Sequence, residues 1–228
     1  MSYIKTYKKA NKNSYFSAVS LIFIIVGCTF LLLAYGPLIR DEIWFYLKEA
    51  RSQKITLNDV AAQKDSVFAR FLTTKPISIE PANEDFAVVI ERIGLSAPIV
   101  KDVTVIDEDV YNQSLKEGIA HAASSNYPSK DPGNTYLFAH ASVNFWELGK
   151  HATEFNLLRK LEPEDRIHVF FEGDTYVYEV MNKEVYPGWN TFPLSRSVIE
   201  PILTLQTCDP PGTTINRLVV TAKLKEIL

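Results

Sequence analysis

A long uncharged stretch near the N-terminus constrains this chain more than any other feature. No charged residue occurs between Lys12 and Arg40, and residues 16–35 are mostly apolar. A helix of about 20 such residues spans the ~30 Å hydrocarbon core of a bilayer. A core helix is seldom so apolar, and a cleaved signal peptide normally has a shorter apolar run with a clear cleavage site. The sequence therefore predicts an uncleaved membrane anchor over residues 16–39, after a short basic tail over residues 1–15.

Basic residues flank this anchor on both sides. Four lysines precede it and four Lys or Arg follow it within about 15 residues, so positive charge alone does not decide its orientation. Over the whole chain, residues 1–75 carry eleven Lys or Arg and five Asp or Glu, a net +6, whereas residues 76–228 carry thirteen and twenty-two, a net −9. The acidic part is a poor candidate for nucleic-acid binding, which needs concentrated basic charge.

Beyond the anchor the pattern changes from helical to extended. Residues 40–80 are charged and amphipathic and end in a segment with two prolines, which predicts a stalk or linker. From residue 81 onward, short β-branched and aromatic runs alternate with turn residues, which predicts a mainly β domain over residues 81–228, either an antiparallel sandwich or a closed barrel. A short helix is expected over residues 152–161. The expected strands are 86–93, 96–100, 135–140, 166–171, 175–181, 202–207 and 217–224.

One thiol stands apart in the soluble part of the chain. Cys208 ends an apolar run and Arg217 opens the next, whereas the other cysteine, Cys28, lies in the anchor, so neither a disulfide within the chain nor a zinc site is expected. If the two runs pair antiparallel, Cys208 and Arg217 meet at the loop end of the pair. A guanidinium beside a thiol stabilises a thiolate or an oxyanion. An inert buried cysteine, and a surface ion pair between Arg217 and Asp209, are the alternatives.

A reactive thiol needs an acid–base partner, and four histidines are available. His140 ends a predicted strand, where its side chain can reach over a cleft, so it ranks first and His121 ranks second. His168 lies within a predicted strand, and His151 is expected in a solvated loop.

The stretch from Leu203 to Leu224 resembles the signature of sortases, the cysteine transpeptidases of bacterial cell envelopes. The Thr-Cys pair at residues 207–208 stands nine residues before Arg217, as in that family. The resemblance covers residues 85–224 in order, which makes it far more specific than one Thr-Cys pair. The upstream segments that carry it are residues 90–100, 115–121, 132–140, 155–167 and 176–178.

This resemblance implies an eight-stranded closed β-barrel with short helices, preceded by one transmembrane helix. It implies that Cys208 is the nucleophile, His140 the catalytic acid and base, and Arg217 the essential arginine. The chain departs from the family at two positions, with Ala139 where glycine is usual and Ala141 where arginine is frequent.

The resemblance also implies a substrate, a sorting motif of the Leu-Pro-x-Thr-Gly type. It would be cleaved after threonine through a thioester and transferred to an amine such as that of a peptidoglycan precursor. Thr207, Trp189 and His121 are expected to contact the substrate, although Trp189 could instead cap the core. No cofactor and no metal are expected, because the acidic residues 107–109 are better explained as a solvated turn than as a calcium site.

The spacing around the Thr-Cys pair is closest to the lid-less, housekeeping-like subclasses, classes D and E. A pilin-polymerising sortase that uses a lysine acceptor is the alternative within the family, but residues 41–85 lack the Asp-Pro-aromatic motif of many such lids. The alternative from another class is a non-catalytic envelope barrel that binds sorting peptides. The expected location is the cell membrane, with a single pass and the catalytic domain outside.

Overall fold

A computed structural model describes residues 12–57, 76–104, 108–141, 151 and 153–228. The chain forms two compact units, residues 1–36 and residues 37–228, each with its own internal contacts. The first helix, α1, runs from Lys12 to Ala50 and contributes to both units.

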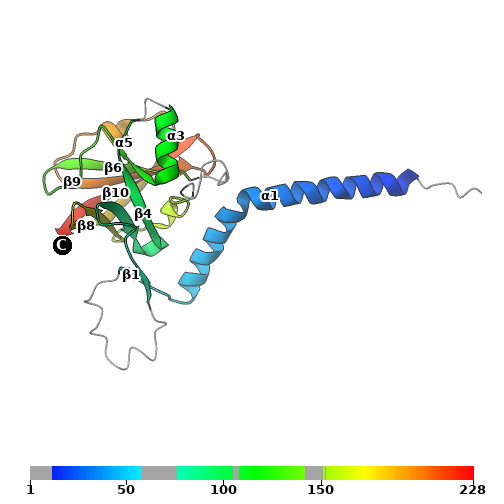
Figure 1. Cartoon of the computed structure of the whole chain (residues 1–228), viewed down its shortest axis with the longest axis horizontal. Coiled ribbons are helices and arrows are strands. Elements are labelled where there is room, and N and C mark those ends of the chain that lie inside the picture. The colour runs from blue at the N-terminus through cyan, green and yellow to red at the C-terminus, as the bar shows by residue number, and fades with distance from the viewer. Residues whose placement is uncertain (1–11, 58–75, 105–107, 142–150, 152) are drawn as a thin grey trace, which may run out of the picture. The chain divides into compact units, whose positions relative to one another are not determined.

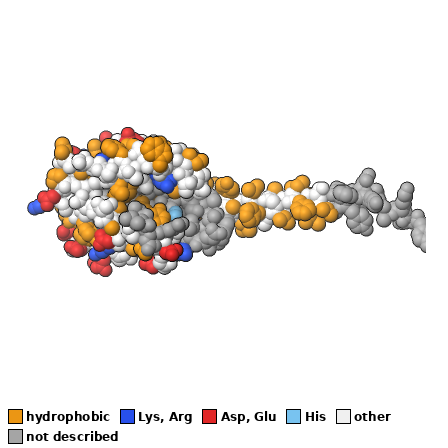
Figure 2. Space-filling view, turned by 90° about the horizontal axis from the view of Figure 1, so that it is seen from above, with side chains coloured by type: hydrophobic (Ala, Val, Ile, Leu, Met, Phe, Trp, Pro, Cys, Tyr) orange, Lys and Arg blue, Asp and Glu red, His pale blue; other side chains and the backbone are white. Residues whose placement is uncertain are grey.

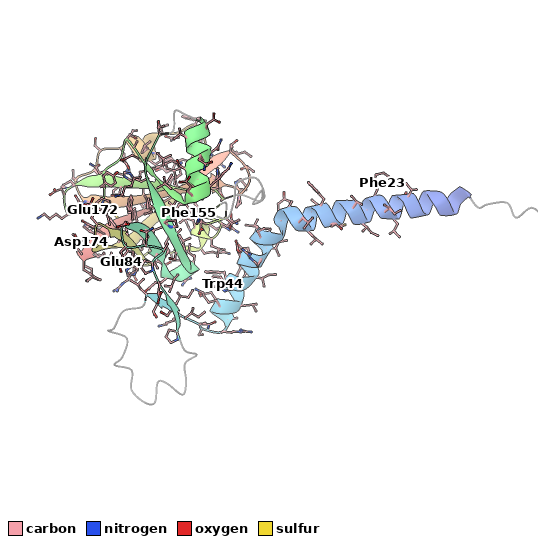
Figure 3. The ribbon with its side chains drawn as sticks, in the orientation of Figure 1. Phe23, Trp44, Glu84, Phe155, Glu172 and Asp174 are labelled. Carbon is pink, nitrogen blue, oxygen red and sulfur yellow. The ribbon has the colours of Figure 1, made fainter. Side chains whose placement is uncertain are left out.

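The first unit contains the apolar part of α1. From Val19 onward this helix is long and apolar enough to cross a membrane. Its large apolar side chains are exposed, as at Phe23, 72% exposed (Figure 3), and Figure 2 shows apolar side chains over most of the visible face of this helix. Because water would disfavour so much bare apolar surface, the helix is a candidate membrane span, in line with the predicted anchor.

The second unit begins with the last part of α1. Phe45 is 5% exposed and belongs to the hydrophobic core of the barrel, and Lys48 is buried and donates to the carbonyl oxygen of Arg92 at 2.5 Å. Trp44 lies against Gly94, where an added Cβ would come within 2.8 Å of the indole ring (Figure 3). The sequence placed residues 40–80 in a linker, whereas α1 packs on the barrel as far as Lys48.

Residues beyond α1 also belong to this unit. Strand β1, Ile55–Leu57, pairs in parallel with β2, Ile77–Ile79, although these two runs were expected within the linker. Residues 58–75, the rest of the expected linker, lie outside the described residues.

The remaining strands close into a barrel of eight, confirming the closed-barrel prediction (Figure 1). Around the barrel the order is β10-β8-β7-β3-β4-β5-β6-β9. Two of the pairs, β4 with β5 and β6 with β9, are parallel, so the barrel is mixed rather than purely antiparallel. The bounds are β3 Phe86–Ile90, β4 Leu95–Val103, β5 Ile119–Ala122, β6 Gly133–Phe138, β7 Arg166–Phe171, β8 Asp174–Pro187, β9 Pro201–Asp209 and β10 Asn216–Ile227.

Alternation along the strands separates an inner face from an outer face. Inward side chains such as Leu137, Leu205 and Val220 join one large core, whereas Tyr136 and Phe138 lie in a second, smaller cluster beneath a helix. That helix is α3, Glu108–Glu117, which connects β4 to β5 and packs on the outside of both (Figure 1). Strand β6 is therefore buried on both faces.

The short helical elements differ from the prediction. The prediction of a helix over residues 152–161 is wrong. The described part of this segment consists of turns and a 3-10 helix, η3, Leu158–Lys160. Phe155, Leu158 and Leu161 are nevertheless buried, because turns of three residues point them inward as a helix would. Strand β3 ends earlier than expected, where the 3-10 helix η2, Glu91–Ile93, begins, and a further short helix, α5, spans Phe192–Ser195.

Acidic side chains gather at one end of the barrel. Figure 3 labels Glu84, Glu172 and Asp174 there, and the Glu172 amide donates to the carbonyl oxygen of Asp85 at 3.1 Å. This end contains the start of β3 and the turn between β7 and β8.

Candidate active site

Three predicted site residues lie in one row. His140 follows the end of β6, Cys208 lies near the end of β9, and Arg217 lies near the start of β10. Arg217 is the register partner of Cys208 across β10 and β9. Phe138 pairs with Gln206 across the parallel strands β6 and β9, and two residues further on each chain stand His140 and Cys208. Since neighbouring strands lie about 4.8 Å apart, Cys208 has His140 on one side and Arg217 on the other.

Hydrogen bonds hold the peptide groups on both sides of His140. The Thr207 hydroxyl donates to the carbonyl oxygen of Ala139 at 2.9 Å, and the Gly212 amide donates to that of Ala141 at 2.7 Å. Thr207 is buried and is committed to this contact, so its side chain fixes the His140 backbone to β9. The structure therefore gives Thr207 a local structural contact where a substrate contact was expected.

Arg217 is held at the mouth of the loop between β9 and β10. Its Nη1 donates to the carbonyl oxygens of Thr214 at 3.3 Å and Asn216 at 3.2 Å. Within the part of the chain that the structure describes, no carboxylate forms an ion pair with Arg217, so the pair with Asp209 is not formed. The guanidinium keeps donors and its positive charge available beside the thiol.

Burial shifts the pKa values of Cys208 and His140 in opposite directions. It raises the pKa of the Cys208 thiol, an effect that the positive charge of Arg217 partly offsets. Burial also lowers the pKa of His140, whose Nε2 has no hydrogen-bond partner among the described residues. Near neutral pH both groups are therefore mainly uncharged, and the thiolate–imidazolium pair is a minor form.

Polar side chains line the outer face of β6 and β9 next to this row. The Tyr136 hydroxyl donates to Oε1 of Gln206, the residue two before Cys208. Nη2 of Arg196, from the connection between β8 and β9, donates to the hydroxyls of Thr204 and Thr221, both at 2.9 Å. This connection is thus attached to the outer face of β9 and β10, four residues along each strand from Cys208 and Arg217.

The connection between β8 and β9 contacts the loop between β9 and β10 at Gly188. Its amide donates to the carbonyl oxygen of Ile215 at 2.8 Å, and a Cβ at this position would overlap the carbonyl oxygen of Thr214. Only glycine permits this approach of two backbones. Trp189, the next residue, is 82% exposed, so it does not cap the core and lies at the rim of the site.

A protein-family model described as the sortase domain matches residues 88–225. The chain belongs to the sortase family. It is therefore a cysteine transpeptidase, and the row formed by His140, Cys208 and Arg217 falls within the matched residues.

Solved structures support the fold. Sortase C-1 from Actinomyces oris is 26% identical with a TM-score of 0.53, and the match covers 64% of this chain and 76% of that chain. A sortase D5 transpeptidase from Clostridium perfringens is 24% identical (TM-score 0.50; 65% and 82% covered), and sortase E1 from Streptomyces coelicolor, solved with a tripeptide in its active site, is 20% identical (TM-score 0.50; 64% and 90% covered). A search among curated proteins gave no match. These neighbours represent three sortase classes.

His121 does not lie in the row formed by His140, Cys208 and Arg217. His121 is fully buried on β5, opposite Leu137 on β6, which in turn pairs with Leu205, three residues before Cys208. Its Nε2 lies 3.1 Å from the carbonyl oxygen of Asn126, and its ring stacks on Tyr127. Burial lowers the pKa of His121. These contacts are those of a core histidine.

The other two histidines also lie outside the row. His151 was expected in a solvated loop, but it is buried and its Nδ1 lies 2.8 Å from Oε1 of Glu154. His168 is buried on β7, with Nε2 3.7 Å from Glu91. Of the acidic residues 107–109, expected in a solvated turn, Asp107 lies outside the described residues, and Glu108 and Asp109 begin helix α3.

Sequence reasoning missed Tyr111, Tyr136, Gln206 and Arg196. The pairing of β6 with β9 places Tyr136 beside β9, and α3 carries Tyr111. Gln206 is on β9 itself, two residues before Cys208, and Arg196 reaches β9 and β10 from the connection between β8 and β9. Alternation along β9 could have indicated Gln206, because residues two apart share one face of a strand.

Proposed function

We propose that this sortase cleaves a sorting motif of the Leu-Pro-x-Thr-Gly type and transfers the cleaved protein to an amine of the cell envelope. The observation that supports this proposal is the row of His140, two residues after β6, with Cys208 on β9 and Arg217 on β10. A nucleophile, an acid and base, and an oxyanion donor within one row are the groups that acyl transfer needs.

The first half-reaction forms a thioester. The Cys208 thiolate attacks the carbonyl carbon of the motif threonine, and an N–H group of Arg217 donates to the oxygen as it becomes negative. Protonated His140 gives its proton to the glycine nitrogen as the peptide bond breaks. The products are a threonyl thioester on Cys208, a neutral His140 and a released peptide with a free amino group.

The second half-reaction reverses these roles. An acceptor amine attacks the thioester carbonyl and passes a proton to neutral His140. The Cys208 thiolate then leaves, so the new amide bond forms and the starting thiolate–imidazolium pair returns. No redox partner or metal takes part in this scheme, which uses only the thiol, the imidazole and the guanidinium.

The rim near Trp189 and the loop between β9 and β10 are proposed to contact the motif. Both flank Cys208, and Trp189 presents an exposed aromatic face beside the row. Thr207 and His121 were also expected to contact the substrate. Both side chains are buried, so the proposed substrate-contacting surface does not include them.

We further propose that residues 16–39 anchor the sortase in the membrane by a single pass, with the catalytic domain, residues 81–228, outside. The solitary thiol of this domain and its sorting-motif chemistry favour the envelope side. Residues 40–80 lie between the anchor and this domain in sequence, and their described parts belong to the same compact unit as the barrel. Residues 1–15 form the cytoplasmic tail. Protease treatment of intact cells tests the orientation, since only an outward domain would be digested.

A peptide assay tests the function. Full-length protein is incubated with a library of sorting peptides, with and without small amines, and products are identified by mass spectrometry. We expect amide products that require Cys208 and an amine. Hydrolysis that amines leave unchanged would identify a peptidase instead, and binding without cleavage would identify a non-catalytic peptide-binding barrel.

The acceptor separates the two sortase roles. The 26% identity with a class C sortase keeps the pilin-polymerising role as the second candidate. Transfer to a short peptide with a lysine side chain, but not to an α-amine, would support it. Transfer to an amine of a peptidoglycan precursor supports the lid-less, housekeeping-like role of classes D and E, which we favour.

A further inference from the structure

The imidazole of His140 contacts an aromatic residue of α3. The Tyr111 ring is edge-on to the imidazole, with ring centroids 6.2 Å apart and an interplanar angle of 85°. The same tyrosine ring stacks on Phe138 at 5.4 Å and 9°. Phe138 and His140 are two residues apart, so Tyr111 spans both outward-facing positions at the end of β6.

Tyr111 is itself fixed by the packing of α3 on the barrel. Leu115, one turn later on the same face of α3, is 1% exposed and packs with Ala120 and Phe138. Burial raises the pKa of Tyr111 to about 12, the charge of Cys208 adds to this rise, and Arg217 opposes it. The phenol is therefore neutral at working pH and lies within electrostatic reach of both groups.

Among the described residues, no side chain forms a hydrogen bond that would orient the His140 imidazole. Such a base is generally aligned by a hydrogen bond to a third group. Here Nε2 is buried with no hydrogen-bond partner among the described residues, and no described carboxylate pairs with His140. The ring contact with Tyr111 is an interaction that can restrict how the imidazole turns.

We propose that Tyr111 is a positioning residue, which aligns the His140 imidazole through ring packing and keeps water from its outer side. This inference rests on the proposed role of His140 in acyl transfer. It assigns the effect to the aromatic ring and not to the hydroxyl. A small misplacement of a catalytic group can reduce rates by up to ~10²-fold.

The test compares Tyr111→Leu with Tyr111→Phe in the full-length protein in detergent micelles. We expect Tyr111→Leu to lower kcat for peptide transfer about tenfold or more with little change in KM, and Tyr111→Phe to restore most of the rate. Gln113→Ala, on the exposed face of α3, is the matched control and should behave as wild type. Tyr111→Met is a second non-aromatic variant in case Tyr111→Leu does not fold.

A titration gives a readout that does not depend on turnover. The histidine resonances are followed by NMR with labelled histidine, and His140→Gln identifies the relevant signal among four histidines. The charged or titratable groups known to face His140 are Cys208 from β9, Arg217 from β10 and Tyr111 from α3. In Tyr111→Leu water reaches the ring, so the pKa of His140 should rise toward its ordinary value of 6.5.

The outcomes separate this inference from the proposed function. If wild type forms no transfer product, the proposed function fails, while the titration still decides whether Tyr111 controls the His140 environment. The positioning role is overturned if Tyr111→Leu leaves both kcat and the titration unchanged, or if Tyr111→Phe is as impaired as Tyr111→Leu. A fall in kcat with an unmoved titration would also overturn it, because Tyr111 would then act on the substrate.

Discussion

Burial disfavours the charged form of both Cys208 and His140. Because the charged form of the thiol is an anion and that of the imidazole is a cation, their pKa values shift in opposite directions. Burial raises the pKa of the thiol and lowers that of the imidazole, and Arg217 reduces the first effect without removing it. The uncharged pair is thus the main form over a wide pH range. The reactive thiolate–imidazolium pair carries the same number of protons, so its fraction is constant across that range.

The pH profile follows from these directions. We expect kcat/KM for transfer to be flat between a lowered His140 pKa, below 6.5, and a raised Cys208 pKa, above 9.0. The rate falls at lower pH because Cys208 and His140 are then both protonated, and at higher pH because both have lost a proton. Stopped assays across pH 4.5–10.5 would measure it, and a single sharp optimum near pH 7 would contradict this account.

Arg217 should be needed for chemistry more than for folding. Arg217→Ala removes the donor to the developing oxyanion, so kcat should fall by ~10²-fold or more while the thermal midpoint changes little. Arg217→Lys keeps the charge but loses the fork of N–H donors, and should recover only part of the loss. Peptide-transfer kinetics with thermal melts measure both, and a fully active Arg217→Lys would show that charge alone is required.

Thr207 should act through the backbone beside His140. Thr207→Val keeps the shape but removes the hydrogen bond to Ala139, which leaves a buried carbonyl oxygen without this donor. We expect a loss of ~1–3 kcal/mol in unfolding free energy and a lower kcat. Thr207→Ser, which restores the donor, is the control. If Thr207→Val raises only KM, the side chain contacts substrate after all.

At the scale of whole elements, the strands could be predicted better than their partners. Short β-branched and aromatic runs identified seven of the eight barrel strands, all except β5, and the loop between residues 207 and 217 placed Cys208 beside Arg217. The parallel pairing of β6 with β9, which puts His140 beside Cys208, joins segments some 70 residues apart and leaves no local pattern. The polar helix α3 was missed because only its Tyr111 face packs on the barrel.

The connection between β8 and β9 should depend on Arg196. Arg196→Ala removes its bonds to Thr204 and Thr221, so the connection that carries Trp189 should loosen. We expect a severalfold rise in KM for sorting peptides, with little change in the alkylation rate of Cys208 by a small reagent. Arg166→Ala, an exposed arginine on β7, is the control. Equal losses of peptide transfer and alkylation would mean that Arg196 supports the row itself.

At the scale of the whole molecule, the end of α1 is part of the catalytic unit. Glu42 on α1 pairs with Arg159 and Lys160, and Phe45 enters the core. The linker expected from composition could not reveal this, because charged residues here form specific ion pairs with the barrel instead of a solvated stalk. The long apolar helix could be predicted, because a run of about 20 apolar residues is typical of a membrane span, and it is a candidate span in the structure.

Phe45 provides the stability test at this scale. Phe45→Ala should cost about 3–5 kcal/mol of unfolding free energy, because it leaves a cavity where a buried ring was. Leu47→Ala, on the exposed side of the same helix turn, should change little. Thermal melts in micelles compare them. Equal melting points for Phe45→Ala and wild type would mean that α1 does not stabilise the barrel.

The central claim is that Cys208 carries an acyl group in a site that His140 and Arg217 complete. Intact-mass measurement of the full-length protein, after rapid mixing with a sorting peptide and acid quench, tests it most directly. The account predicts a mass increase equal to the threonyl fragment, on Cys208 alone, that an added amine removes. It also predicts no adduct in Cys208→Ala and a much slower one in Arg217→Ala. An adduct on another residue, or rapid turnover of sorting peptides by Cys208→Ala, would contradict the account.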